Sequence, residues 1–357
     1  MDISGKDIRG ILEIAVKENA SDIFIVAGLP VTWRANGKIH HIDGEKLMPA
    51  RTESYVQEIY ALAGERSMER LQRYGDDDFS FAVGGLSRFR VNAYKQRGSL
   101  SAVVRVITFD LPDPEDIDIP SRIIEFGKLS KGLVLVTGPA GSGKSTTLAC
   151  IVNEINNTQE KHIITLEDPI EYLHRHNRSI VSQREINLDT ESYVTALRAS
   201  LRQSPDVILL GEMRDYETIE VAMTAAETGH LVISTLHTIG AANTIDRIID
   251  VFPANQQRQI AVQLSMVLQA VVSQQLVPDT EEKLVPAFEI MTVNPAIRNM
   301  IRDNKVPQID GILYSSSKPE MISMDSSLLR LYREKRITAQ TAAAYATNPD
   351  MLSKKMK

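Results

Sequence analysis

The sequence predicts an α/β protein in which a domain with a mostly parallel sheet follows a smaller α+β domain. From residue 130 onward, apolar runs that suit buried strands alternate with segments of helical periodicity, an order typical of parallel sheets. Residues 1–109 instead combine helices with short strands joined by tight connections. The length of 357 residues supports this division, because it is long for one hydrophobic core and suits two.

The composition narrows the class of protein. Hydrophobic residues make up 43% and charged residues 24% of the chain, as in ordinary soluble globular proteins. A net charge of −6 argues against a surface built to grip nucleic acid. Cys150 is the only cysteine, which excludes an intramolecular disulfide and a multi-cysteine zinc cluster. Neither a signal pattern nor an apolar run of membrane-spanning length is present, so we expect a cytoplasmic protein.

The first domain alternates helical and strand patterns. Residues 31–42 predict a hairpin that turns at Asn36-Gly37, because this dipeptide favours the tight turn between two strands. We expect further helices over 4–18, 50–63 and 66–74, and strands over 21–26, 78–83, 88–94 and 100–107.

Arginines gather on the predicted strands of this domain. Strand alternation places Arg88 and Arg90 on one face, Arg105 interrupts an apolar strand, and Arg97 lies in the connection between the two strands. They could simply form a solvated sheet face. Alternatively, they form a cationic face that meets nucleotide phosphates at a domain or subunit boundary, a role that suits the permanently charged guanidinium fork.

Residues 110–120 mark the domain boundary. Three prolines and five acidic residues within this stretch disfavour a regular helix or strand. We therefore expect a first domain over 1–109, a linker over 110–120 and a second domain over 121–357.

The most informative pattern is Gly138-x-x-x-x-Gly143-Lys144-Ser145, the phosphate-loop pattern. An apolar strand over 133–136 precedes it and a helix over 145–156 follows, which is the context that the pattern requires. Glycine backbones can fold around phosphate, Lys144 can reach the outer phosphates, and the Ser145 hydroxyl can ligate Mg²⁺. We expect the nucleotide to be bound by Gly138, Pro139, Ala140, Gly141, Ser142, Gly143, Lys144, Ser145 and Thr146.

Two further strands end in acidic residues. The strand over 162–166 runs into Glu167-Asp168, and the strand over 207–210 runs into Gly211-Glu212. Carboxyl ends of parallel strands share one edge of the sheet, so these acids should lie beside the phosphate loop. Because Gly211 stands where a metal-binding Asp often precedes the Glu, we expect Glu212 to orient the attacking water and Glu167 to support the metal. The alternative for Glu167 and Asp168 is an acidic turn closed by Pro169.

His230 and His237 bracket the next predicted strand, over 230–235. We consider both as phosphate-sensing residues, and the alternative is that both are structural. The remaining expected elements are a helix over 189–203 with Asp189 as its N-cap, helices over 217–228, 241–250 and 256–272, a strand over 284–290, helices over 295–302, 325–335 and 338–347, and a frayed tail over 348–357.

Four ordered segments together resemble the secretion ATPases. The phosphate loop, Ile164–Glu171, Val207–Asp215 and Thr228–Thr238 resemble the Walker A, Asp, Walker B and His boxes of that family. The resemblance is closest to the PilT family of type IV pilus retraction motors, and it extends over Ala20–Ile23, Arg88–Ala93 and Ala296–Asp303.

The resemblance implies a PAS-like first domain, a RecA-like second domain, and a homo-hexamer that hydrolyses ATP with Mg²⁺. It makes Glu212 the catalytic glutamate and Glu167 the Asp-box acid, and it brings Arg90 and Arg105 to the nucleotide. Ala296–Asp303 is similar to the retraction motif Ala-Ile-Arg-Asn-Leu-Ile-Arg-Glu, from which Met300 and Asp303 depart conservatively.

The family's assembly and type II secretion members usually carry a four-cysteine zinc motif that one cysteine cannot make. We therefore expect a retraction motor, active in twitching motility, that acts on an inner-membrane pilus platform protein and binds neither zinc nor nucleic acid. The alternatives are an accessory pilus ATPase paralogue and a RecA-like nucleic-acid motor.

Overall fold

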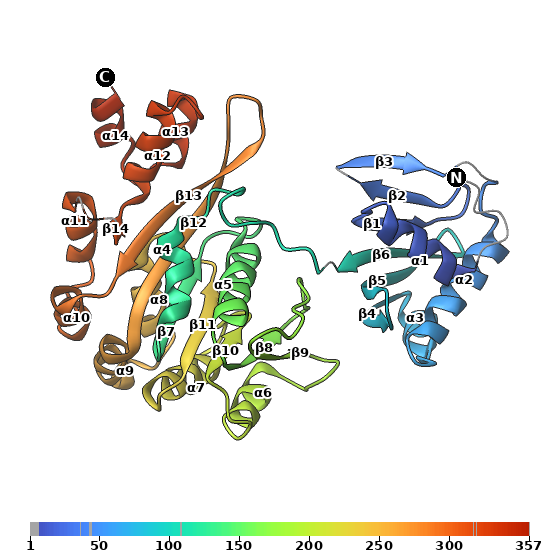
Figure 1. The fold of residues 1–357 in the computed structure, drawn as a ribbon, viewed down its shortest axis with the longest axis horizontal. Coiled ribbons are helices and arrows are strands. Elements are labelled where there is room, and N and C mark those ends of the chain that lie inside the picture. The colour runs from blue at the N-terminus through green and yellow to red at the C-terminus, as the bar shows by residue number, and fades with distance from the viewer. Residues whose placement is uncertain are drawn as a thin grey trace. The chain divides into compact units, whose positions relative to one another are not determined.

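The structure is a computed structural model that describes residues 7–35, 37–42, 45–107, 109–316, 318 and 320–356. Contacts within the chain divide it into two compact units. Unit 1 extends to Asp110 and includes Glu171–Leu173, and unit 2 comprises Leu111–Ile170 and His174–Lys357 (Figure 1). Residues 110–120 contain no helix or strand.

Unit 1 is an antiparallel sheet with helices on one face. Its six described strands lie in the order β3-β2-β1-β6-β5-β4. Apolar side chains such as Phe89 and Val91 on the sheet pack with Ile11 and Ile59 from the helices in one core. The strands are β1 (Asp22–Ile25), β2 (Thr32–Ala35), β3 (Lys38–His41), β4 (Asp76–Val83), β5 (Ser87–Gln96) and β6 (Ser99–Ile107), and the helices are α1 (Ile8–Lys17), α2 (Pro49–Leu62) and α3 (Glu69–Tyr74).

The predicted hairpin of unit 1 is confirmed. Strands β2 and β3 pair antiparallel, with Ala35 opposite Lys38. Gly37 has a φ of 72°, the left-handed conformation that the turn requires. Asn36 and residues 4–6 of the predicted first helix lie outside the described residues.

Unit 2 is built on an eight-stranded sheet in the order β14-β13-β12-β7-β11-β10-β8-β9. The strands β12, β7, β11, β10, β8 and β9 pair parallel with their neighbours. At the other side of β12, β13 pairs antiparallel with β12, and β14 pairs antiparallel with β13. The predicted α/β class with a mostly parallel sheet is therefore confirmed. The strands are β7 (Gly132–Thr137), β8 (His162–Glu167), β9 (Ile180–Glu185), β10 (Val207–Leu210), β11 (Leu231–Leu236), β12 (Leu268–Pro278), β13 (Leu284–Thr292) and β14 (Met321–Ile322).

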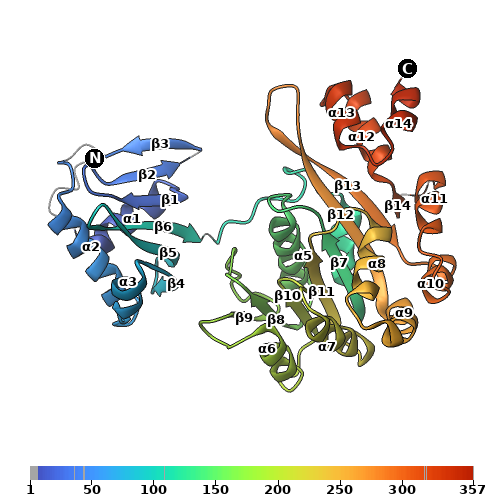
Figure 2. The ribbon, with the colours of Figure 1, turned by 180° about the vertical axis from the view of Figure 1, so that it is seen from behind.

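Helices cover both faces of this sheet (Figures 1 and 2). Along β7, Leu133 and Leu135 enter the core formed with α6 to α11, whereas Val134 and Val136 enter the core formed with α4 and α5. Strands buried on both faces read as continuous apolar runs, which is why they were predictable. The helices are α4 (Ser121–Ile124), α5 (Lys144–Thr158), α6 (Tyr193–Ser200), α7 (Tyr216–Glu227), α8 (Ala241–Asp250), α9 (Ala254–Val267), α10 (Pro295–Arg302), α11 (Gln308–Ser315), α12 (Met324–Arg333), α13 (Ala339–Tyr345) and α14 (Pro349–Met356), and a 3-10 turn spans Glu125–Lys128.

Two helix boundaries differ from the prediction. Asp189 is not the N-cap of α6, because Ser192 accepts the hydrogen bond from the Thr195 amide and Asp189 instead accepts one from the Glu185 amide. The helix predicted over 256–272 ends at Val267, and the apolar residues after it begin β12 beside β7. Periodicity alone does not distinguish a buried strand from a buried helix here.

The tail is also more ordered than predicted. Residues 349–356 form α14, and Leu352 is 1% exposed in a small core with α12, α13 and the ends of β12 and β13. The sequence prediction missed α4 and the 3-10 turn after it, as well as α11, α14, β9, β12 and β14.

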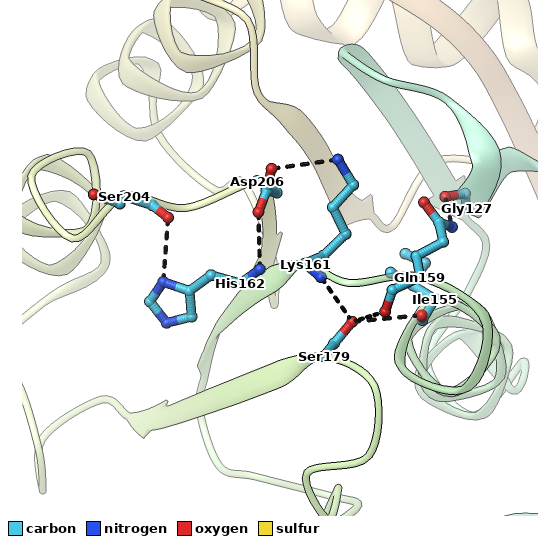
Figure 3. A network of polar contacts seen from close by, with 8 residues as sticks. All are labelled: Gly127, Ile155, Gln159, Lys161, His162, Ser179, Ser204 and Asp206. Atoms are coloured by element: carbon cyan, nitrogen blue, oxygen red, sulfur yellow. Dashed lines mark hydrogen bonds and ion pairs between the residues drawn. The ribbon is translucent and has the colours of Figure 1, made fainter.

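A network of polar contacts lies at the amino ends of β8 and β10 (Figure 3). Asp206 accepts the His162 amide at 2.9 Å and pairs with the Lys161 ammonium at 3.3 Å. Ser179 donates to the Gln159 carbonyl at the end of α5 at 2.7 Å. The network ties the amino ends of these strands to α5, whereas ligands of open α/β sheets bind beyond the carboxyl ends.

Candidate active site

The phosphate loop lies between β7 and α5, and two of its glycines are fixed by close neighbours. Gly138 and Gly143 have φ values of 142° and 86°. A Cβ on Gly138 would lie 2.1 Å from the carbonyl oxygen of Gln274, and one on Gly143 would lie 2.8 Å from its side-chain Nε2. Both positions therefore require glycine, because L side chains rarely adopt these conformations and have no room here.

Lys144 and Ser142 offer donors to an anion within this loop. The Lys144 ammonium is 9% exposed and donates to the carbonyls of Gly138 at 2.9 Å and Pro139 at 2.8 Å. The buried hydroxyl of Ser142 has no hydrogen-bond partner among the described residues. A buried hydroxyl without a partner is costly unless a ligand binds it, so the loop fits a nucleotide phosphate. Ser145 and Thr146 follow in the first turn of α5.

Glu167 and Gly211 are neighbours at the carboxyl edge of the sheet. β8 and β10 pair with Leu166 opposite Leu210, and the Gly211 amide donates to the Leu166 carbonyl at 2.8 Å. Glu167 accepts hydrogen bonds from Thr165 at 2.6 Å and Gln183 at 3.2 Å, so its carboxylate is held in place.

A side chain at position 211 would crowd the Tyr193 hydroxyl. A Cβ there would lie 2.8 Å from that hydroxyl and 3.2 Å from the Leu166 carbonyl oxygen. An Asp in place of Gly211 would therefore require Tyr193 to move, and the carboxylates that follow β8 and β10 are Glu167, Asp168 and Glu212.

Glu212 is bracketed by two basic groups. One carboxylate oxygen lies 2.5 Å from the Arg214 guanidinium and the other 3.4 Å from the His237 Nε2. The Glu212 side chain is only 12% exposed, whereas the two partners are mostly exposed. The hydrogen bond that Arg214 donates to the Glu212 carboxylate raises the pKa of Arg214. Two residues that the sequence analysis selected for the site, His237 and Glu212, are therefore in contact in the structure.

Oxygen ligands suited to Mg²⁺ are present at this edge. Ser145, Glu167 and Glu212 supply hydroxyl and carboxylate oxygens. No group of three or more His, Cys, Asp or Glu side chains that could hold a metal by itself occurs within the described ranges. This donor set fits Mg²⁺, which is commonly bound through one or two carboxylates together with substrate phosphates and water.

His230 lies at the amino end of β11, so the structure does not bring it to the phosphate loop, as the prediction of a phosphate-sensing role requires. It precedes the first residue of β11, and its carbonyl accepts the amide of Gly132, where β7 begins. Its ring nitrogen Nδ1 lies 2.9 Å from the Ala225 carbonyl. Six strand residues separate His230 from His237 along β11, a span of about 20 Å.

Three residues at the site were not predicted from the sequence. Arg214 pairs with Glu212, as described above. The Tyr193 hydroxyl abuts Gly211, and burial, followed by the charges of Glu212, Asp168 and Glu167, raises the pKa of Tyr193. Gln274 on β12 accepts a hydrogen bond from Thr147 of α5 at 2.8 Å. No local motif marks Tyr193 or Gln274, because only the folding of distant segments brings them here.

Arg90 and Arg105 lie in unit 1, directly opposite each other on β5 and β6. Arg90 pairs with Asp78 at 2.7 Å and Arg105 with Asp22 at 3.1 Å. Together with Asn92 and Val103, these four residues line a hollow of about 310 Å³ on the sheet face. Arg97 occupies the turn between the two strands with a φ of 50°. Arg90 and Arg105 therefore share one face of the sheet, and part of their charge is balanced by the two acids.

The comparisons with known proteins identify the family. The sequence model of the family described as "Type II/IV secretion system protein" matches residues 3–353. The chain belongs to this family. Within it, the chain is similar in length and sequence to secretion ATPases of the PilT type.

The type IV pilus retraction ATPase PilT of Pseudomonas aeruginosa is 42% identical over 344 residues, which cover 96% of this chain and 99% of that protein. A twitching motility protein of Neisseria gonorrhoeae is 41% identical, with 97% of this chain and 92% of that protein covered. A crystal structure of the pilus retraction motor PilT with bound ADP superposes with a TM-score of 0.88 at 43% identity, with 98% and 99% of the two chains covered.

The PilT-type chain has no helix, in the portion that the structure describes, with the length and apolarity needed to cross a bilayer.

Proposed function

We propose that this chain hydrolyses ATP to power the retraction of a type IV pilus. One observation carries the proposal: the phosphate loop, Glu167 and the Glu212–His237 pair all lie at the carboxyl edge of one parallel sheet. Phosphoryl transfer requires positioned phosphates, neutralised charge and an oriented water, and these groups suit those three tasks.

The phosphate loop would hold the triphosphate. The Lys144 ammonium, which contacts the Gly138 and Pro139 carbonyls, would turn to the outer phosphates, and the Ser142 hydroxyl would gain a partner. Ser145 and Glu167 would hold Mg²⁺, which supplies neutralisation of the charge that develops on the phosphates.

Glu212 would orient the attacking water. Its carboxylate is little exposed and is held from both sides by Arg214 and His237, so it has few alternative orientations. A carboxylate fixed in this way can accept a proton from water while His237 remains close enough to respond to the terminal phosphate.

We further propose that the chain works as a homo-hexamer on an inner-membrane pilus platform protein, at the cytoplasmic face of the membrane. Arg90 and Arg105, from the first domain of the same or a neighbouring subunit, would approach the phosphates, and turnover would change the domain angle across residues 110–120. Repeated closures around a ring would deliver force to the partner.

Deletion of the gene tests the biological role. We expect surface pili that persist without retracting, with recovery when the intact gene is returned. Normal retraction after deletion would contradict a primary motor and favour an accessory paralogue.

An ATPase assay with and without DNA tests the alternative of a nucleic-acid motor. We expect the purified protein to release phosphate from ATP without any nucleic acid, and phosphate release that requires DNA would favour the nucleic-acid motor.

A further inference from the structure

A pair of buried polar residues on neighbouring strands holds the segment that carries His237. Ser273 on β12 and Glu289 on β13 are directly opposed in the antiparallel register. They are 0% and 5% exposed. Buried polar side chains need hydrogen-bond partners, and both find them outside their own sheet.

The partners of this pair are the first amides of α8. The Gly240 amide donates to the Ser273 hydroxyl at 2.9 Å, and the Ala241 amide donates to Glu289 Oε1 at 2.8 Å. Gly240 is the N-cap residue of α8, and Ala241 is the first helical residue. The sheet therefore satisfies two amides at the start of the helix that have no partner within the helix.

His237 lies three residues before this cap. The connecting residues are braced as well, because the Thr238 and Thr244 hydroxyls lie 2.8 Å apart and Thr244 also donates to the Gly240 carbonyl at 2.7 Å. A shift at Gly240 would therefore move the backbone of His237 relative to Glu212.

Glu289 makes a second connection, to the C-terminal helices. Its Oε2 accepts the amide of Met324, the first residue of α12, at 3.3 Å. Burial raises the pKa of Glu289, and the two amide hydrogen bonds oppose that rise. One carboxylate thus joins the start of α8 to the start of α12.

We propose that Ser273 and Glu289 are positioning residues for His237, and that Glu289 couples the His237 segment to the helices α12 to α14. The proposal rests on the role given to His237 under the proposed function. A simple helix cap would contribute to stability alone, so the tests compare turnover and local opening as well as folding.

The first test is Ser273→Ala in the full-length protein. We expect kcat for ATP hydrolysis to fall about fivefold, the scale of one lost hydrogen bond, with the KM for ATP little changed. The matched control is Ser265→Ala, which removes another buried hydroxyl, bonded to the Val262 carbonyl within α9. Equal kcat values for the two variants would overturn the proposal.

The second test is amide hydrogen exchange measured by mass spectrometry. Ser273→Ala should accelerate exchange in peptides that contain Gly240, and Glu289→Gln should accelerate it at both Ala241 and Met324. Ser265→Ala should change neither region. Faster exchange throughout the chain would overturn the proposal, because the two residues would then act on global stability and not on the His237 segment. Acceleration by Glu289→Gln at Ala241 alone would overturn the coupling to α12.

The third test is a double-mutant cycle between Ser273→Ala and His237→Ala. If Ser273 acts through His237, its loss should cost little further turnover in a chain that already lacks His237. Additive losses would contradict positioning. Normal ATP turnover by His237→Ala alone would overturn both the role of His237 and the proposal that Ser273 positions it. The proposal that the chain hydrolyses ATP is tested separately, by substitution of Glu212.

Discussion

At the scale of single residues, Gln274 supports the phosphate loop from outside the motif. Its backbone carbonyl and side chain fill the space beside Gly138 and Gly143, and its side-chain oxygen accepts the buried hydroxyl of Thr147. The loop conformation therefore depends on a strand more than a hundred residues further along the chain.

We predict that Gln274→Leu lowers the free energy of unfolding by about 1–3 kcal/mol, because the Thr147 hydroxyl then lacks its partner. Thr147→Val combined with Gln274→Leu should be less destabilising than the two single changes summed. The matched control is Gln275→Leu, because the Gln275 side chain donates a long bond of 3.4 Å to the Tyr345 carbonyl. Denaturant unfolding of the four variants checks this, and strictly additive losses at Thr147 and Gln274 would contradict it.

The site residues that could be predicted from the sequence are those that belong to a local sequence pattern. Gly138, Lys144 and Ser145 belong to one short pattern, and Glu167 and Glu212 each end an apolar strand. Tyr193 and Gln274 reach the site only through the tertiary fold, so no local pattern marks them. The prediction for His230 failed because His230 precedes its strand and so lies at the amino end of β11, whereas the phosphate loop and Glu212 lie at the carboxyl ends of the parallel strands.

At the scale of elements, the C-terminal helices form a small core of their own. Leu352 of α14 is buried with Leu328 and Leu331 of α12. The sequence predicts a frayed tail there, because residues 348–357 are mostly polar and rich in lysine. β12 was missed for a related reason, since its first residues continue the apolar pattern of α9.

We predict that Leu352→Ala destabilises the packing of α14 by about 2–5 kcal/mol, the range for removing a buried leucine side chain. The neighbouring Met351→Ala should have little effect, because Met351 is 41% exposed. Hydrogen exchange over residues 324–356 measures both variants. Similar protection in the two variants would contradict the burial of Leu352.

At the scale of the whole molecule, the two units carry different parts of the proposed mechanism. Unit 2 holds the phosphate loop and Glu212, and unit 1 holds Arg90 and Arg105. The parallel sheet was predictable because its strands are apolar on both faces, whereas the approach of the arginines to the nucleotide remains a prediction.

We predict that Arg105→Ala lowers ATP turnover by at least about tenfold while thermal unfolding is unchanged, since arginines that stabilise phosphoryl transfer commonly contribute more than this. Arg34→Ala is the matched control, because Arg34 on β2 also pairs with Asp22, at 3.6 Å. Equal turnover in the two variants would assign Arg105 to a solvated sheet face.

The most direct test of the account is Glu212→Gln, measured by ATP binding and by phosphate release under single-turnover conditions. Glu217→Gln, an exposed substitution in the first turn of α7, serves as the control. We expect Glu212→Gln to bind ATP as the unmodified protein does and to release phosphate at least about a hundredfold more slowly, the scale of a lost general base. Phosphate release at the rate of the Glu217→Gln control would contradict the assignment of Glu212, and with it the proposed site of hydrolysis.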